Sequence, residues 1–226
     1  MTLLFIHGAG GSHLSWQLQL HHFKEARAVD LPGHPDGSGC STIGEYVDWV
    51  EEYVNAHAIQ DLVLAGHSMG GAISIEYALR DSNLRGLVLV GTGARLRVRQ
   101  DITDMILKDY DEMSKFVAGL SVAPNCEPVV VDRIAKEMLK VRAEVTHGDW
   151  IACNEFDRMN EVERIRMPTL VICGTDDRLT PPKYSQYLHE KIPRSRLVVI
   201  PDAGHSVMLE QHKAFNEALE TFLASL

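Results

Sequence analysis

The sequence has no long hydrophobic run. Its first apolar stretch, Leu3–Ile6, is much shorter than the hydrophobic core of a signal peptide, and no basic residue precedes it. No other stretch approaches the roughly 20 apolar residues that a membrane-spanning helix needs. We therefore expect no membrane association and a cytoplasmic location.

Cysteine is scarce as well. The chain has four cysteines, at positions 40, 126, 153 and 173, without a Cys-x-x-Cys pair or a histidine spacing typical of zinc sites. A domain of this size without a secretory leader does not need disulfides for its stability. The sequence therefore predicts reduced thiols and no metal site.

Positive charge is in deficit. Lys and Arg number 22 against 31 Asp and Glu, so the formal net charge is −9. An acidic surface repels phosphate backbones and anionic lipids, which argues against nucleic acid and membrane surfaces as partners. The 226 residues suit one domain with an insertion, and we expect a small-molecule substrate and a monomer or homodimer.

The sequence does contain short apolar runs that alternate with longer helical segments. The candidate strands are Leu3–His7, Arg27–Asp30, Leu62–Gly66, Leu87–Gly91, Thr169–Gly174 and Leu197–Pro201. Several are continuously apolar, as expected of parallel strands that are covered on both faces. The alternation predicts an α/β fold with a mostly or fully parallel sheet and helices on both of its faces.

One predicted helix runs from Thr42 to about His57. It begins with a capping box, because Glu45 stands three residues after Thr42 and can bond back to it. The last predicted helix has one apolar stripe, formed by Phe215, Leu219, Phe222 and Leu226. Both patterns are typical of helices that pack one face against a sheet.

Residues 94–167 interrupt the alternation. They hold 12 of the 22 basic residues, patches of helical periodicity at Ile102–Leu107 and Val131–Val141, and no clear strand of the central sheet. The loop Ser121–Pro128, with two prolines, separates these patches. We predict a helical cap over the sheet's edge, inserted into an α/β core that residues 1–93 and 168–226 form.

Ser68 stands between a predicted strand and an apolar helix, in the pattern Gly66-x-Ser68-x-Gly70 of a nucleophile elbow. A sharp turn from strand to helix lifts the serine hydroxyl clear of the sheet and leaves no room for side chains at the two glycines. The first N–H groups of the helix, including that of Met69, can stabilise an oxyanion. We predict Ser68 as a nucleophile.

A serine nucleophile needs a base, and His205 is the best placed of the 11 histidines. It follows a predicted strand, at the carboxyl end where open α/β sheets bind ligands. His67 is expected to point away from the hydroxyl. Asp176 or Asp177, in the turn after the preceding strand, is the acid expected to orient the imidazole of His205.

The chain resembles the α/β-hydrolase family, in its compact esterase-like branch with a helical cap. The matching motifs, in the family's order, are His7–Gly11, Asp30–His34, Gly66–Gly71, Gly174–Pro181 and Asp202–His205. The resemblance implies that His7 and the loop Asp30–His34 are structural. Relatives carry an antiparallel strand pair before the strand that leads to His7. This chain starts at that strand, so we expect about six strands.

The resemblance also assigns roles to residues near Ser68. The family spacing selects Asp177 over Asp176 as the acid that orients His205. It implies that the backbone N–H groups of Ala9 and Met69 form the oxyanion hole.

The predicted reaction is hydrolysis of small carboxylic esters through an acyl-enzyme on Ser68, without a metal or an organic cofactor. Thioester or lactone hydrolysis and carbon–carbon bond hydrolysis are alternatives with the same triad. A lyase reaction would also need a cap lysine, for which Lys108, Lys115, Lys136 and Lys140 are available. A receptor-like hydrolase, which binds a small ligand and signals to a partner protein, is the alternative from another class.

The cap carries no motif for one substrate. Trp150, Asn154 and Phe156 are predicted to line an acyl pocket, although aromatic residues at helical spacing also fit a packed core. The basic residues at positions 95, 97 and 99 are more typical of a solvated face than of a site for an anionic substrate.

Overall fold

The computed structural model describes residues 1–80 and 83–226, so residues 81 and 82 of the predicted core lie outside the described part. Within that part, six strands form one sheet in the order β2-β1-β3-β4-β5-β6, and every neighbouring pair is parallel. The strands are β1 (Thr2–Ile6), β2 (Arg27–Val29), β3 (Leu62–His67), β4 (Gly86–Val90), β5 (Thr169–Gly174) and β6 (Ser195–Ile200). The predicted fold class is confirmed.

Alternate side chains of the central strands pack on opposite faces of the sheet. Along β1, Leu4 and Ile6 belong to one buried cluster, whereas Leu3 and Phe5 belong to another. Helices α2 (Ile43–Ala56), α3 (Met69–Arg80) and α8 (Pro182–Lys191) cover the first face. The second face is covered by η1 (His13–Trp16), α1 (Gln17–His22), α9 (Val207–Glu210) and α10 (His212–Leu223). Burial on both faces explains why these strands are apolar without alternation.

The capping box at the start of α2 is present as predicted. The Thr42 side chain accepts a hydrogen bond from the Glu45 N–H, and the Glu45 carboxylate accepts one from the Thr42 N–H. The stripe predicted for the last helix is buried at Phe215, Leu219 and Phe222. Leu226 stands beyond the end of α10 and is only partly buried.

The segment between β4 and β5 is helical. Helices α4 (Gln100–Lys108), α5 (Tyr110–Leu120), α6 (Pro128–Met138) and α7 (Ala143–Glu155) follow one another, and the short η2 (Val162–Arg164) leads into β5. We call α4 to α7 and the loops that join them the cap. The chain enters and leaves the cap side by side, since Arg95 forms an antiparallel bridge with Asp157.

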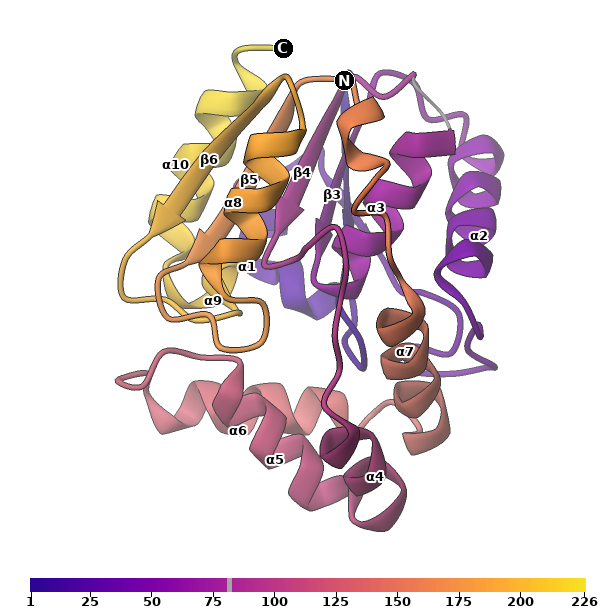
Figure 1. Ribbon diagram of the computed structural model, residues 1–226, viewed down its shortest axis with the longest axis vertical. Coiled ribbons are helices and arrows are strands. Elements are labelled where there is room, and N and C mark those ends of the chain that lie inside the picture. The colour runs from indigo at the N-terminus through magenta and orange to yellow at the C-terminus, as the bar shows by residue number, and fades with distance from the viewer. Residues whose placement is uncertain (81–82) are drawn as a thin grey trace.

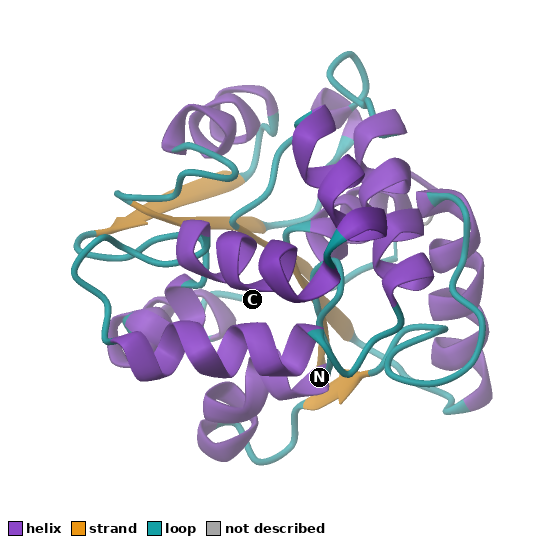
Figure 2. Cartoon of the chain, turned by 90° about the horizontal axis from the view of Figure 1, so that it is seen from below, coloured by secondary structure: helices purple, strands orange, loops and turns teal. Residues whose placement is uncertain are grey.

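The cap covers the carboxyl ends of the strands rather than an edge of the sheet. The arrowheads of β4 and β5 point toward the cap helices in Figure 1, and both chain ends lie on the opposite side. Seen from below in Figure 2, helices stand in front of the strand ends. The prediction of a position over the sheet's edge was wrong because β4 and β5 are neighbours, so the segment that joins them starts at the carboxyl end of β4.

No helix in residues 1–80 and 83–226 is long and apolar enough to cross a membrane.

Candidate active site

Ser68 occupies the turn between β3 and α3 with a backbone φ of +53°. This left-handed conformation is unusual for a residue with a side chain and is characteristic of strained functional turns. A Cβ atom at Gly70 would lie 2.6 Å from the His7 carbonyl oxygen, and one at Gly66 would lie 2.5 Å from Ser74 Oγ. The two glycines are therefore required by crowding, as the elbow pattern predicts.

The loops after β1 and β3 lie next to each other, because these strands are neighbours in the sheet. A Cβ atom at Gly8, in the first loop, would lie 3.1 Å from Ser68 Cβ in the second. The winding of the sheet changes direction here, since β2 lies on one side of β1 and β3 on the other. Such switch points are the usual ligand sites of open α/β sheets.

Two backbone N–H groups in these loops have no acceptor among the described residues. Among the hydrogen bonds of the described residues, none is donated by the N–H of Ala9 or by that of Met69. Met69 is the first residue of α3, so its N–H has no partner within the helix. Unsatisfied N–H groups at a helix start can bind a negatively charged oxygen.

The loops after β5 and β6 bring a carboxylate to an imidazole. Asp177 Oδ2 lies 2.9 Å from His205 Nδ1, and both side chains are buried. The same oxygen accepts a hydrogen bond from Thr180 Oγ1 at 2.9 Å, while Asp177 Oδ1 accepts from the Leu179 and Thr180 N–H groups. Since the carboxylate can only accept, Nδ1 carries the proton and Nε2 of neutral His205 is left as an acceptor.

The pKa of Asp177 lies below its usual value. Burial by itself raises the pKa of this carboxyl group, but the charge of His205 and the hydrogen bonds from His205 and Thr180 outweigh it. The carboxylate therefore stays ionised beside the imidazole. Asp176 points elsewhere and accepts a hydrogen bond from Thr175 Oγ1 at 2.7 Å.

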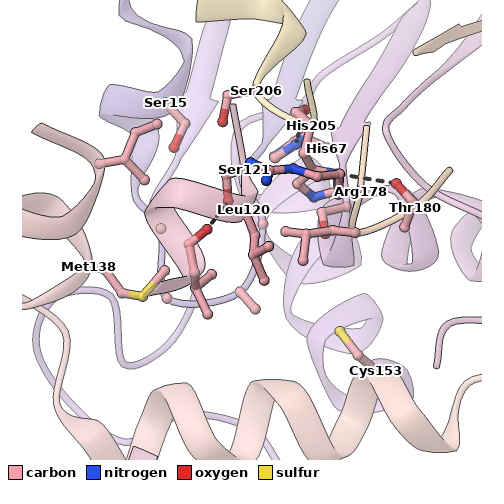
Figure 3. Close-up of a pocket in the computed structure, with 18 of the residues that line it drawn as sticks. Ser15, His67, Leu120, Ser121, Met138, Cys153, Arg178, Thr180, His205 and Ser206 are labelled. Carbon is pink, nitrogen blue, oxygen red and sulfur yellow. Dashed lines mark hydrogen bonds between the residues drawn. The ribbon is translucent and has the colours of Figure 1, made fainter. Parts of the chain in front are cut away.

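Ser68 and His205 line one cavity of about 490 Å³ under the cap. Figure 3 shows His205 beside His67 and Thr180, with Leu120 and Ser121 of the cap close by. No hydrogen bond joins Ser68 Oγ to His205 in the part of the chain that the structure describes. Hydrogen bonds of this kind are often long until a substrate binds.

The comparisons with known proteins show the family and the fold of this chain. A sequence model described as the alpha/beta hydrolase family matches residues 3–218. The chain belongs to the alpha/beta hydrolase family. It is 36% identical to the solved structure of a thermophilic esterase, with a TM-score of 0.87, over 99% of this chain and 89% of that one.

Two curated relatives are more distant. A pimeloyl-[acyl-carrier protein] methyl ester esterase of Neisseria meningitidis is 27% identical over 214 residues, which cover 87% of this chain and 81% of that protein. The AB hydrolase superfamily protein YisY of Bacillus subtilis is 26% identical over 242 residues, which cover 97% of this chain and 90% of that protein.

The cap and the core both contribute walls to the cavity of this alpha/beta hydrolase. Trp150 lines the cavity, as predicted, together with apolar residues of the cap such as Ile102, Val117 and Met138. Asn154 and Phe156 are not among the residues that line it. Asn154 is exposed and accepts a hydrogen bond from the Val98 N–H.

Phe156 belongs to the packed core of the hydrolase. It is 4% exposed and lies with Ala94 and Val162 in the cluster that covers one face of the sheet. Helical spacing placed Phe156 and Asn154 near Trp150 in sequence, but α7 ends at Glu155 and turns Phe156 inward. The prediction that Asn154 and Phe156 line the pocket is therefore not borne out by the structure.

His67, next to the serine, contacts His205 through the backbone. Its Nε2 donates a hydrogen bond to the His205 carbonyl oxygen at 3.0 Å, and the two rings are 4.6 Å apart. Burial, followed by the charge of His205, lowers the pKa of His67 to about 3. His67 is therefore a neutral donor that restrains the loop of His205, which agrees with its predicted direction away from the hydroxyl.

His7 follows β1 and the loop Asp30–His34 follows β2, and a hydrogen bond connects the two. His7 Nδ1 donates to the Gly8 carbonyl oxygen, and Nε2 accepts from the Leu31 N–H at 3.1 Å. Burial and the nearby charge of His34 lower the pKa of His7 to about 4, so its ring is neutral.

Sequence reasoning missed several residues around the site. Thr180 follows Asp177 by three residues in a turn, and only the folded turn shows that its hydroxyl bonds the carboxylate. Asp149 lies far from the motifs in sequence, and Glu210 follows the motif Asp202–His205 without belonging to it. Neither carries a local signal, yet both accept hydrogen bonds from loops at the site. Within the described residues, no cluster of His, Cys, Asp or Glu could hold a metal ion.

Proposed function

We propose that this chain is a serine hydrolase that cleaves small carboxylic esters through an acyl-enzyme on Ser68. His205 is the general base, Asp177 orients it, and the N–H groups of Ala9 and Met69 bind the oxyanion. The observation that carries the proposal is the hydrogen bond of 2.9 Å between Asp177 and His205, at the cavity that the strained Ser68 also lines.

The proposed reaction has two steps. Ser68 Oγ attacks the ester carbonyl carbon while His205 Nε2 takes the hydroxyl proton. The carbonyl oxygen becomes negative and is held by the N–H groups of Ala9 and Met69. The C–O bond to the alcohol then breaks as His205 returns its proton to the leaving oxygen, and water hydrolyses the acyl-enzyme by the same sequence.

The imidazolium that forms in each step is balanced by Asp177. Its ionised carboxylate lies against Nδ1 and is itself fixed by Thr180, so the tautomer and the orientation of the His205 ring are set before the substrate arrives. An environment arranged in advance does not need to reorganise during the reaction.

A small ester fits the cavity best. Its volume of about 490 Å³ is in the ordinary range for small-molecule sites, and most of its wall is apolar, with side chains from both the cap and the core. The names of two similar proteins support the same substrate class, since one is a thermophilic esterase and the other a methyl ester esterase.

The lyase alternative has less support. It needs a cap lysine near the serine, but Lys108, Lys115, Lys136 and Lys140 are absent from the described residues that line the cavity. Thioester, lactone and carbon–carbon bond hydrolysis would use the same groups as ester hydrolysis. These reactions therefore belong to the same substrate screen.

The test is a screen of wild type and Ser68→Ala against neutral 4-nitrophenyl esters of increasing acyl length, with thioesters and diketones in parallel. Wild type is expected to hydrolyse short esters fastest, and Ser68→Ala to lose on the order of 1000-fold or more in kcat/KM. Activity that persists in folded Ser68→Ala would overturn the proposal. Tight ligand binding with very slow turnover on every substrate would instead support a receptor-like role.

A further inference from the structure

Asp149 is a buried carboxylate that the proposed reaction does not use. It lies on α7 of the cap, and its side chain has no solvent exposure. Removing a carboxylate from water costs several kcal/mol, so other groups must compensate for its charge. Tyr46 Oη donates to Asp149 Oδ1 at 2.5 Å, and the Gly10 N–H and His34 Nε2 donate to Oδ2 at 2.9 Å and 2.8 Å.

The hydrogen bonds of His34 show that the partner of Asp149 is charged. His34 Nδ1 donates to the Pro32 carbonyl oxygen at 2.9 Å, while Nε2 faces Asp149. Both acceptors lack a proton to give, so both ring nitrogens carry one. Burial opposes this charge, but the hydrogen bond to Asp149 and its negative charge raise the pKa of His34 above its usual value. The pair is a buried ion pair between the cap and the core.

The third partner of Asp149 belongs to the loop that carries the Ala9 N–H. Gly10 has a φ of +61°, and the loop is closed by a hydrogen bond from the Gly11 N–H to the Gly8 carbonyl oxygen at 3.0 Å. The Gly10 N–H is one peptide unit away from that of Ala9. A hydrogen bond that fixes the first therefore restricts the torsion angles that aim the second.

The cap also packs directly on this loop. A Cβ atom at Gly10 would lie 3.1 Å from Met138 Cγ and 3.1 Å from Thr146 Cγ2, which belong to α6 and α7. No core residue accepts the Gly10 N–H among the hydrogen bonds of the described chain. The conformation of the loop thus depends on a side chain that comes from the cap.

We propose that Asp149 is a positioning residue that holds the loop after β1 so that the Ala9 N–H points at the oxyanion. The inference rests on the function proposed above, in which Ala9 supplies one of the two oxyanion donors. It goes beyond that function because it makes the cap part of the catalytic machinery: the cap completes the oxyanion hole as well as enclosing the substrate.

A purely structural role for Asp149 makes a different prediction. If the ion pair only joined cap and core, its loss would lower the fraction of folded molecules and leave the rate of each folded molecule unchanged. The positioning role requires a loss of transition-state stabilisation in molecules that are folded. All rates are therefore expressed per active site, counted by titration with a fluorophosphonate.

The main variant is Asp149→Ala, which removes the acceptor for the Gly10 N–H. Its kcat on a short 4-nitrophenyl ester should fall on the order of 100-fold, as for a misplacement of about 1 Å. KM should change by no more than about threefold, since the ground state makes little use of the oxyanion hole. Affinity for an alkyl boronic acid, which forms a tetrahedral adduct on Ser68, should fall by the same factor as kcat.

Two further variants separate the anchor from the ion pair. Asp149→Asn has nearly the same shape, and its amide oxygen can still accept from the Gly10 N–H, so kcat should recover to within about tenfold of wild type. Tyr46→Phe removes a different hydrogen bond of Asp149 and leaves the loop contact intact. Its kcat should stay within about twofold of wild type even though the protein unfolds at a lower urea concentration.

A kcat for Asp149→Ala within about twofold of wild type, or equal losses in Asp149→Ala and Tyr46→Phe, would overturn the inference. If Asp149→Ala does not fold, the double variant with His34→Leu removes the unpaired charge and should show the same loss. Wild type that fails to react with the fluorophosphonate would instead contradict the proposed function itself.

Discussion

The loops that form the site in the core are joined to one another by backbone hydrogen bonds, whereas charged side chains make most of the hydrogen bonds between these loops and the cap. In the core, the Thr175 and Asp176 N–H groups bond the carbonyl oxygens of Ile200 and Ala203, so the loops after β5 and β6 restrain each other. The cap meets these loops through Glu210 and Arg178, and meets the loop after β1 through Asp149.

Glu210 is the second carboxylate that joins the two regions. Its Oε1 accepts from the Gly204 N–H at 2.9 Å, next to His205, and its Oε2 accepts from the Ala123 N–H of the cap at 2.6 Å. Each side of the site therefore has one carboxylate that joins cap and core. We therefore expect substitutions in the core to lower the rate of the chemical step directly. Substitutions in the cap should instead change the position of the core loops, the choice of substrate or the stability of the protein.

The largest effect is expected within the core, from the two adjacent aspartates. Asp177→Asn should lower kcat by roughly 10,000-fold, because the amide favours the wrong tautomer of His205 and cannot balance its charge. Asp176→Asn should cost no more than about tenfold, since its carboxylate only bonds its own turn. Steady-state kinetics on both folded variants checks this. An inactive Asp176→Asn beside an active Asp177→Asn would move the acid by one residue.

Trp150 lines the cavity, whereas Phe156, just after the end of the same helix, lies in the packed core. Substitutions at the two positions therefore compare a cavity wall with the core. Phe156→Ala should lower the free energy of unfolding by roughly 3 to 5 kcal/mol and leave the preference for acyl length unchanged. Trp150→Ala should change the ratio of rates for short and long acyl chains, because it lines the cavity. Urea unfolding and an ester series measure the two effects. The same change of preference in both variants would contradict this division.

Acid should destabilise the core through its buried neutral histidines. His7 and His67 have pKa values lowered to about 4 and about 3, whereas both bind protons near pH 6.5 in the unfolded chain. Their contribution is complete above pH 6.5 and is lost as the pH falls, by about 2 kcal/mol for each histidine at pH 5. His34, with its raised pKa, contributes in the opposite sense and loses its contribution as the pH rises.

His67→Gln isolates one part of this effect. When the pH is lowered from 7 to 5, the unfolding free energy of His67→Gln should fall by about 2 kcal/mol less than that of wild type, since glutamine does not titrate. Urea titrations at both values give the comparison directly. Identical pH dependence in the two proteins would show that His67 is not the source.

Glu210→Gln is expected to lower both stability and catalysis moderately. Burial raises the pKa of Glu210, because burial opposes the charged form of its carboxyl group. Glutamine can keep one of the two hydrogen bonds that the carboxylate accepts. The free energy of unfolding should fall by about 1 to 3 kcal/mol, and kcat/KM by less than about tenfold, because Asp177 and His67 still hold His205. A loss as large as that of Asp177→Asn would give Glu210 a direct part in catalysis.

The sequence predicts the core better than the cap for a physical reason. Motifs such as the glycines around Ser68 are local: each arises because one strand turns into one helix without room for a side chain. The order of strands and the meeting of their loops then follow from the parallel topology. The sheet of six strands and the elbow could be predicted in this way. The choice between Asp176 and Asp177 could not, and was implied only by the resemblance to the family.

Contacts between cap and core could not be predicted. Asp149 bonds Gly10 across 139 positions of sequence, and Glu210 bonds Ala123 across 87. Neither acid lies in a motif, and helical periodicity does not predict which core loop a cap helix meets. The same limit explains why Phe156 was expected in the pocket and lies in the core.

The most direct test of the account is the site of covalent labelling by a fluorophosphonate. Wild type, Ser68→Ala and Asp177→Asn are treated with the reagent, and the adduct is mapped by peptide mass spectrometry. The account predicts one adduct on Ser68 in wild type, none in Ser68→Ala, and a much slower reaction in Asp177→Asn. An adduct on another residue, or labelling of Ser68→Ala at the wild-type rate, would contradict it.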